Sequence, residues 1–146
     1  MTVVAKKHLS LCVLCVLFLV GIPGTWAAPY DAWEYRAKIT FAGYNQAETL
    51  TNFPVLLRVS TNVVSGFEYS QLASPTNGGD LRFSASNGVD ELNYEIDQWN
   101  TNGVSSVWVK VPTIANSNDF IYMYWGKPGA DVAPCTTNGA TWRATD

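Results

Sequence analysis

Apolar and polar residues alternate along much of the chain, and this alternation predicts β-strands. From Trp33 to Phe41 the odd positions are apolar and the even positions polar, as in a strand with one face on a core and the other in water. Pro54, near the start of the next run, indicates either an edge strand or a first-residue position in a strand. The final run is apolar on both faces. The further runs of strand character are residues 53–59, 81–85, 92–99, 104–111 and 120–125.

The turns between these runs are equally recognisable. Asn87-Gly88 and Asn102-Gly103 are residue pairs that favour tight hairpin turns. No stretch has a convincing helical period, and Val63–Leu72 is the best candidate for a turn or two of helix. Many short strands with turn-marked spacing predict an all-β fold, an antiparallel β-sandwich of jelly-roll or immunoglobulin-like type.

Residues 1–27 have the three parts of a secretory signal peptide, and we expect them to form a signal helix ahead of the sandwich. Lys6 and Lys7 precede the apolar run Leu9–Ile22, and small residues precede a cut expected after Ala27. The run is shorter than the roughly 20 residues of a membrane-spanning helix, although an uncleaved anchor is the alternative. We therefore expect an exported protein, secreted, periplasmic or at the cell surface, with no membrane attachment after cleavage.

The β-sandwich domain is expected to span residues 28–129. Residues 130–146 are rich in Thr, Ala, Asn and Gly, with Trp142 as their only aromatic residue. They are interpreted as a linker or as the truncated start of a following domain. Cys135 is the single cysteine after the leader, so an intramolecular disulfide is excluded. It is a buried thiol, a partner for a cysteine beyond this chain, or a residue without a role.

Charge narrows the classes of partner. After the leader the chain keeps seven Lys or Arg and twelve Asp or Glu, which gives a net charge of 7 − 12 = −5. No basic run remains, and this argues against nucleic acid or an anionic membrane as a partner.

The distribution of catalytic residue types argues against an enzyme. The only histidine, His8, lies in the leader, so the rest of the chain cannot form a Ser-His-Asp site or a histidine metal site. Glu95 and Asp97 share one face of a predicted strand and are the remaining option for a glycosidase pair. They lie on the polar face, where neither carboxyl is desolvated as a general acid requires. We expect no catalytic activity, no metal and no cofactor.

Aromatic residues are the positive signal for binding. Five Trp, seven Tyr and five Phe follow the leader, and sugar-binding proteins use such side chains because each combines a large apolar face with a polar edge. Trp99, Trp108 and Trp125 are the candidates for an exposed ligand-binding face, the last two because they are out of phase with their neighbours. The alternative is that all three fill the core.

Asp80 and Arg82 form a second, polar candidate. They flank Leu81 and share one face of a predicted strand. An ion pair or shared hydrogen bonds at a sheet edge is the structural interpretation. Binding of an acidic or sugar ligand by Arg82 is the functional one.

Six blocks of sequence, in order, resemble a bacterial family known as domain of unknown function 2341 (DUF2341). They are Trp33–Thr40, Leu50–Leu56, Asp80–Phe83, Glu91–Asn100, Val107–Pro112 and Ile121–Gly126. The resemblance implies a β-sandwich module of secreted or envelope proteins. Such modules often precede a concanavalin A-like, laminin-G-type domain, and others accompany proton-channel proteins of the ExbB and TolQ kind. It implies no catalytic residues.

Together these observations predict a non-catalytic extracellular or envelope module. The expected role is binding of polysaccharide or support of an adjacent concanavalin A-like domain in the full-length protein. The alternatives are a structural or adhesion spacer and the periplasmic portion of a proton-channel system of the ExbB/TolQ type.

Overall fold

A computed structural model describes residues 28–143. The predicted signal helix at residues 1–27 lies outside this part. The described chain folds into six strands and two short 3₁₀ helices: β1 (Tyr35–Thr40), β2 (Leu50–Val59), η1 (Tyr69–Gln71), β3 (Arg82–Ser84), β4 (Tyr94–Gln98), β5 (Ser105–Ile114), β6 (Phe120–Trp125) and η2 (Pro134–Thr136).

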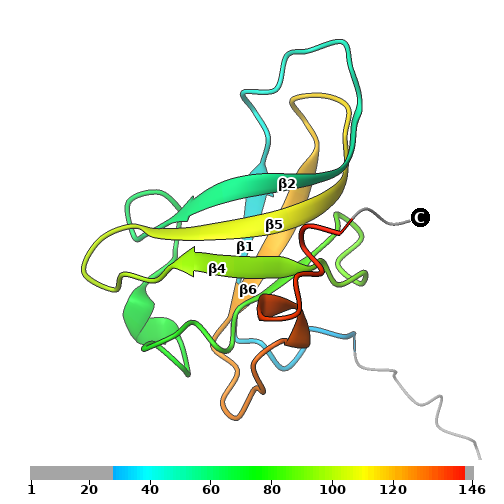
Figure 1. Cartoon of the computed structure of the whole chain (residues 1–146). Coiled ribbons are helices and arrows are strands. Elements are labelled where there is room, and N and C mark those ends of the chain that lie inside the picture. The colour runs from blue at the N-terminus through cyan, green and yellow to red at the C-terminus, as the bar shows by residue number, and fades with distance from the viewer. Residues whose placement is uncertain (1–27, 144–146) are drawn as a thin grey trace, which may run out of the picture.

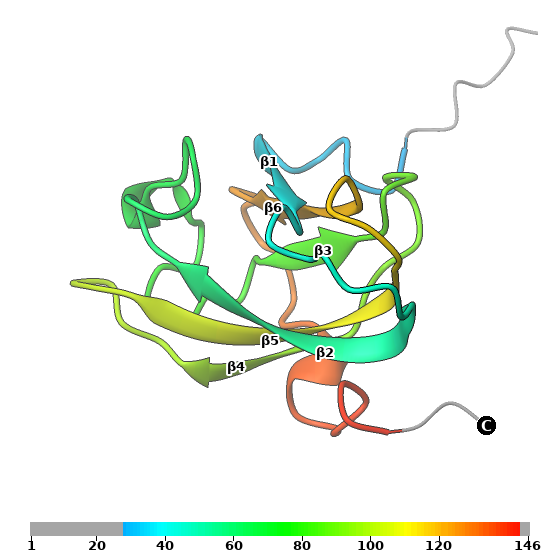
Figure 2. The same cartoon turned by 90° about the horizontal axis from the view of Figure 1, so that it is seen from above.

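The strands form two antiparallel sheets that face each other as a sandwich. One sheet has the order β1-β6-β3 and the other the order β2-β5-β4. Seen from above, the two sheets lie as separate layers (Figure 2), and the broad β2-β5-β4 sheet lies in front of β1 and β6 in Figure 1. The all-β antiparallel sandwich predicted from the sequence is confirmed.

Alternation along the strands separates the core from the surface as predicted. In β5, Val107, Val109 and Val111 are almost fully buried, and Trp108 points to the outer face. In β1, Ala37 is buried while Arg36 and Lys38 are exposed. The inner faces of both sheets therefore close one apolar core, because successive side chains of a strand point to opposite sides.

The two Asn-Gly turns have different outcomes. The turn at Asn102-Gly103 joins β4 to β5, which pair side by side in one sheet. The turn at Asn87-Gly88 closes only a short hairpin, whose two arms pair through a single β-bridge between Ser84 and Glu91. Beyond that bridge the chain moves from one sheet to the other, so β3 and β4 face each other across the core.

The long excursion between β2 and β3 contains very little helix. Within Val63–Leu72 only η1 forms, and Tyr69 fixes it to the sheet. The Tyr69 hydroxyl donates to the Val59 carbonyl at 2.9 Å and lies 2.8 Å from Ser105 Oγ. Beneath it, Phe67 packs into the core. Side-chain packing, rather than a helical period, therefore orders this loop.

Residues 130–143, the described part of the expected linker, pack against the sandwich. Helix η2 lies next to β4, and Ala133, Cys135 and Thr141 are buried. Burial raises the pKa of the Cys135 thiol. The folded part of the chain thus continues beyond Gly129. No helix within residues 28–143 is long and apolar enough to span a membrane.

Candidate functional site

Trp125 lies in the core, and its predicted place on an outer face is wrong. The side chain is 1% exposed, its ring stacks on Tyr35 at 5.7 Å, and its Nε1 donates to Gln71 Oε1 at 2.9 Å. Because β6 is apolar on both faces, the sequence did not specify which phase points inward. Trp125 holds the strand to η1 and is closed to a ligand.

Trp99 is half-buried and is fixed in place by the loop that precedes β3. Its Nε1 donates to the Pro75 carbonyl at 2.7 Å, and its ring packs edge-on against Tyr69 at 5.4 Å. Gly78 lies under the ring so closely that a Cβ there would meet it at 2.8 Å. Much of the surface of Trp99 therefore serves to hold this loop against β4.

Trp108 lies on the outer face of the β2-β5-β4 sheet, where the sequence placed it, next to Leu56 of β2 and Glu95 of β4. Trp142 covers part of its ring, with the two centroids 5.1 Å apart at 60°. The indole Nε1 of Trp142 donates to Glu95 Oε2 at 2.7 Å. Trp142 remains 49% exposed and Leu56 41% exposed. We call Trp108, Trp142, Leu56 and Glu95 the tryptophan platform.

Asp80 is fully buried and ties three backbone segments together. Its carboxylate accepts hydrogen bonds from the backbone N–H groups of Ala73 at 3.0 Å, Ser74 at 2.8 Å and Gly126 at 2.7 Å. Its own carbonyl accepts from Trp33 Nε1 at 2.8 Å. With these donors in place, the carboxylate joins the start of the 73–79 loop to the end of β6.

Arg82 is 8% exposed and turns away from Asp80. Its guanidinium donates to the carbonyls of Gly79 and Leu81, at 3.2 and 2.6 Å, and to the carbonyl of Asp131. It also forms an ion pair with Glu91 at 3.5 Å. The two residues thus occupy separate hydrogen-bond networks, and Arg82 fastens the C-terminal segment to β3.

The carboxylates of the described residues offer no metal centre. Within residues 28–143 no group of three or more His, Cys, Asp or Glu side chains is placed to hold a metal ion. Of the pair considered for glycosidase chemistry, Glu95 is half-buried and accepts the hydrogen bond from Trp142, and Asp97 is exposed. Both lie on the polar side of β4, as predicted.

The outer face of the β1-β6-β3 sheet carries a row of aromatic rings that the sequence analysis did not single out. Phe120, Tyr122 and Tyr124 of β6 follow one another, with centroids 5.4 and 6.1 Å apart, and Tyr30 stacks on Tyr124 at 4.2 Å. Cations from β1 lie over these rings: Lys38 Nζ is 3.9 Å from the centre of Phe120, and the Arg36 guanidinium is 4.6 Å from Tyr122. The sequence signal that could have indicated this face is the alternation of Arg36 and Lys38 with apolar residues in β1.

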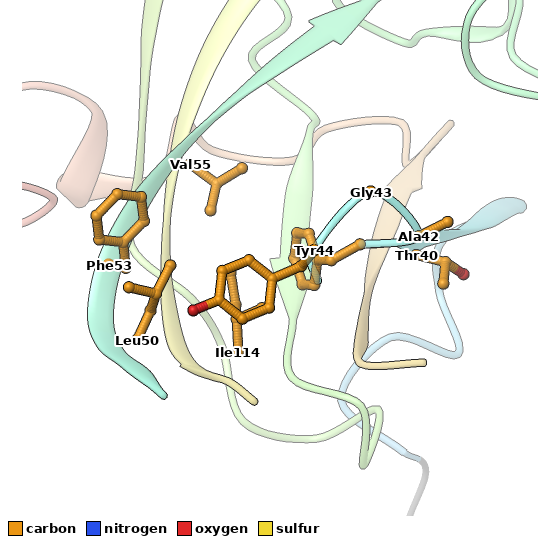
Figure 3. A pocket seen from close by; sticks show the side chains of 9 residues that line it. Thr40, Ala42, Gly43, Tyr44, Leu50, Phe53, Val55 and Ile114 are labelled. Atoms are coloured by element: carbon orange, nitrogen blue, oxygen red, sulfur yellow. The ribbon is translucent and has the colours of Figure 1, made fainter. Parts of the chain in front are cut away.

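An apolar cleft opens at one end of the sandwich. It has a volume of about 340 Å³ and lies between β2 and the loop that follows β1. Figure 3 shows Tyr44 reaching from that loop toward Leu50 and Ile114, with Phe53 and Val55 on the β2 side. None of the predicted site residues lines it, and its lining contains no charged side chain.

Two tyrosines have pKa values above the ordinary range. Burial, the main cause, raises the pKa of Tyr94, whose hydroxyl donates to the Leu81 carbonyl at 2.7 Å. The pKa of Tyr30 is raised by burial and by the negative charge of Glu91. Both hydroxyls therefore keep their protons further into the alkaline range than an ordinary tyrosine does, because their ionised forms would be poorly solvated.

Comparison with known proteins gives one match. Residues 77–141 match the family described as domain of unknown function DUF2341, which confirms the resemblance seen in the sequence. The match covers β3 to η2 and includes Trp108 and Glu95 of the tryptophan platform, whereas Leu56 and Trp142 lie outside it. No curated protein matches the chain, and no solved structure matches it.

Proposed function

Because residues 77–141 match the DUF2341 family, we propose that this chain is an exported, non-catalytic module that binds polysaccharide through its tryptophan platform. The observation that carries the proposal is the pair of indoles, Trp108 and Trp142, on the outer face of a rigid sheet. Indoles suit the apolar face of a sugar ring because they offer a large flat surface with a polar edge.

The geometry of the platform supports binding with little loss of freedom. Trp142 is held by its packing on Trp108 and by its hydrogen bond to Glu95, so its exposed face keeps one orientation. Side chains that are ordered before the ligand arrives lose less entropy on binding. Leu56 extends the apolar surface on the β2 side.

Two features of the sequence support the other parts of the proposal. The leader at residues 1–27 has the composition of a signal for export. The absence of histidine after residue 8 leaves general acid–base chemistry to carboxylates, and Glu95, the carboxylate of the platform, is already engaged by Trp142.

Contact with a neighbouring lectin-like domain is the second candidate function. The observation that favours it is the exposed apolar surface of Trp142 and Leu56, which suits a protein interface as well as a sugar ring. In this role the platform serves as an interface within a longer protein, and the module is a support.

Retention on insoluble polysaccharides tests the proposal. The chain from residue 28 onward contains every described residue and is incubated with a panel that includes cellulose, chitin and xylan. We expect saturable retention on at least one polymer and a loss of about tenfold in affinity for Trp142→Ala, since stacking on one aromatic ring contributes on the order of 1 kcal/mol or more. Trp108→Ala is expected to weaken retention similarly.

Phe53→Ala is the matched control. Phe53 is also a large, exposed apolar side chain, but it lies at the apolar cleft rather than on the platform, so its loss should leave retention unchanged. Unchanged retention in both tryptophan variants would remove the site assignment. No retention on any polymer would overturn polysaccharide binding and favour the interface with a neighbouring domain.

A further inference from the structure

The cations of this acidic chain gather on the face opposite the platform. Seven Lys or Arg side chains lie within the described residues, and four of them lie over aromatic rings of the β1-β6-β3 side. These four are Arg36 over Tyr122, Lys38 over Phe120, and Arg82 and Lys127 over Trp33. Together with Tyr30 and Tyr124, these residues make up what we call the cationic strip. Arg82 is nearly buried and paired with Glu91, so Arg36, Lys38 and Lys127 are the cations that this face offers to an anionic partner.

The two cations of β1 are available to a ligand. Arg36 and Lys38 are exposed, and among residues 28–143 neither forms an ion pair with a carboxylate. Each rests on a ring through a cation–π contact, which positions the charge without neutralising it. A guanidinium that stacks through its face also keeps its N–H groups free in its plane to donate to an acceptor.

A pocket lies at one end of the strip. Its volume is about 270 Å³, and it is lined by Tyr30, Trp33, Tyr124 and Arg36, with Asp31 at its side. This is slightly below the roughly 300–1,000 Å³ of pockets for drug-sized ligands and fits a small ring-shaped group. The three aromatic side chains provide apolar surface, and Arg36 provides a donor for an anion.

We propose that the cationic strip binds an acidic polysaccharide whose sugars carry carboxylates, as uronic acids do. The planar guanidinium of Arg36 matches the two oxygens of a carboxylate. Tyr122 is partly exposed and offers apolar surface to a sugar beside Arg36. Tyr124 and Tyr30 are buried and stack on each other, so they support the strip from within. This site is separate from the tryptophan platform and does not depend on it.

Affinity electrophoresis through gels that contain polygalacturonate tests the proposal with the chain from residue 28 onward. We expect retardation that is lost at high salt, because exposed charges are screened within about 10 Å at 0.1 M salt. The double variant Arg36→Gln/Lys38→Gln is expected to bind at least about tenfold more weakly, since a hydrogen bond to a charged group exceeds one power of ten in affinity. Fully methyl-esterified polygalacturonate, which has the same sugars without the charge, should cause no retardation.

The matched control removes two positive charges from the other side of the molecule. Arg58 and Arg143 are exposed and lie away from the strip, so Arg58→Gln/Arg143→Gln should bind polygalacturonate as the unchanged chain does. If this control loses as much affinity as the β1 variant, binding follows net charge alone and the proposed site is wrong. Equal retardation by poly-glutamate, which has carboxylates but no sugar faces, would also overturn it.

Trp142→Ala separates this proposal from the platform. Because Trp142 lies on the opposite sheet, its loss should leave retardation in polygalacturonate unchanged. If polygalacturonate binding disappears in Trp142→Ala and persists in Arg36→Gln/Lys38→Gln, the anionic polymer uses the platform and the cationic strip is not a binding site. Failure of the platform on neutral polymers has no bearing on the strip.

Discussion

Asp80 and Arg82 are only two residues apart in the chain, yet they contact different parts of the molecule. The Asp80 carboxylate accepts three backbone N–H groups, and Arg82 donates to three backbone carbonyls. Both side chains compensate backbone groups in irregular segments, where no sheet partner is present. Asp80 thus fixes the 73–79 loop, and Arg82 fixes the C-terminal segment.

Replacing Asp80 should destabilise the fold without touching either proposed binding face. In Asp80→Ala three backbone N–H groups lose their acceptor, and each buried unsatisfied group costs about 1–3 kcal/mol. We expect the free energy of unfolding, measured by urea denaturation, to fall by about 3 kcal/mol or more. Asp97→Ala is the control, because Asp97 is exposed and surface changes stay within about 0.5 kcal/mol. Equal stability of the two variants would contradict this role for Asp80.

At the scale of elements, the sequence did not predict which face of β6 points into the core. In β1 the outward residues are polar and the inward ones apolar, and in β5 three valines alternate with Trp108 and Lys110, so the buried side follows directly from the alternation. In β6, Ile121, Met123 and Trp125 point inward, while Phe120, Tyr122 and Tyr124 point outward. Both sets are apolar, and only pairing with β1 decides between them.

The C-terminal segment is the second element that alternation did not describe. Residues 131–143 contain no strand, and their packing depends on a few anchors. Ala133 and Cys135 are buried beside β4, and the main-chain carbonyls of Asp131 and Arg143 accept from Arg82 and Lys110. Such contacts join residues 33 and 49 positions apart, and a local pattern carries no information about them.

A chain that ends after Gly129 should therefore be much less stable than the whole. It loses the buried apolar groups beside β4 and leaves the nearly buried Arg82 and Lys110 without those acceptors. We expect the free energy of unfolding by urea to fall by at least about 3 kcal/mol. A chain that ends after Arg143 keeps every one of these contacts and should match the full chain. Equal midpoints for the chains that end after Gly129 and Arg143 would show that the segment adds nothing to the fold.

At the scale of the whole molecule, burial of tyrosines and of one thiol predicts sensitivity to alkali. The pKa values of Tyr30, Tyr94 and Cys135 are raised in the folded chain, and in the unfolded chain they ionise at their ordinary values of 10.0, 10.0 and 9.0. The folded state therefore holds more protons above about pH 9. Stability contributed by these groups is complete below pH 9 and declines as the pH rises through the folded pKa values.

Urea denaturation between pH 7 and pH 11 checks this dependence. We expect a constant free energy of unfolding up to about pH 9 and a steady fall above it. Tyr94→Phe should be less stable at pH 7, because the hydrogen bond to the Leu81 carbonyl is lost, but its stability should fall less steeply with pH. A slope above pH 9 that is identical in this variant would exclude Tyr94 as a source of the effect.

The two proposed binding faces are a property of the whole sandwich. The tryptophan platform and the cationic strip lie on outer faces of different sheets. One is built from indoles and an engaged carboxylate, and the other from phenyl and phenol rings with cations over them. A module with two such faces can contact two chemically different polymers at once.

The amino-acid sequence by itself determined that the chain is an all-β sandwich, where most of its strands lie, and that Trp108 faces outward. These properties depend on alternation and turn chemistry, which act between residues close together in the chain. Only the tertiary structure decided that Trp125 is buried, that Trp142 packs on Trp108, and that Arg36 lies over Tyr122. The last two contacts join residues 34 and 86 positions apart, and tertiary packing, rather than any local preference, brings them together.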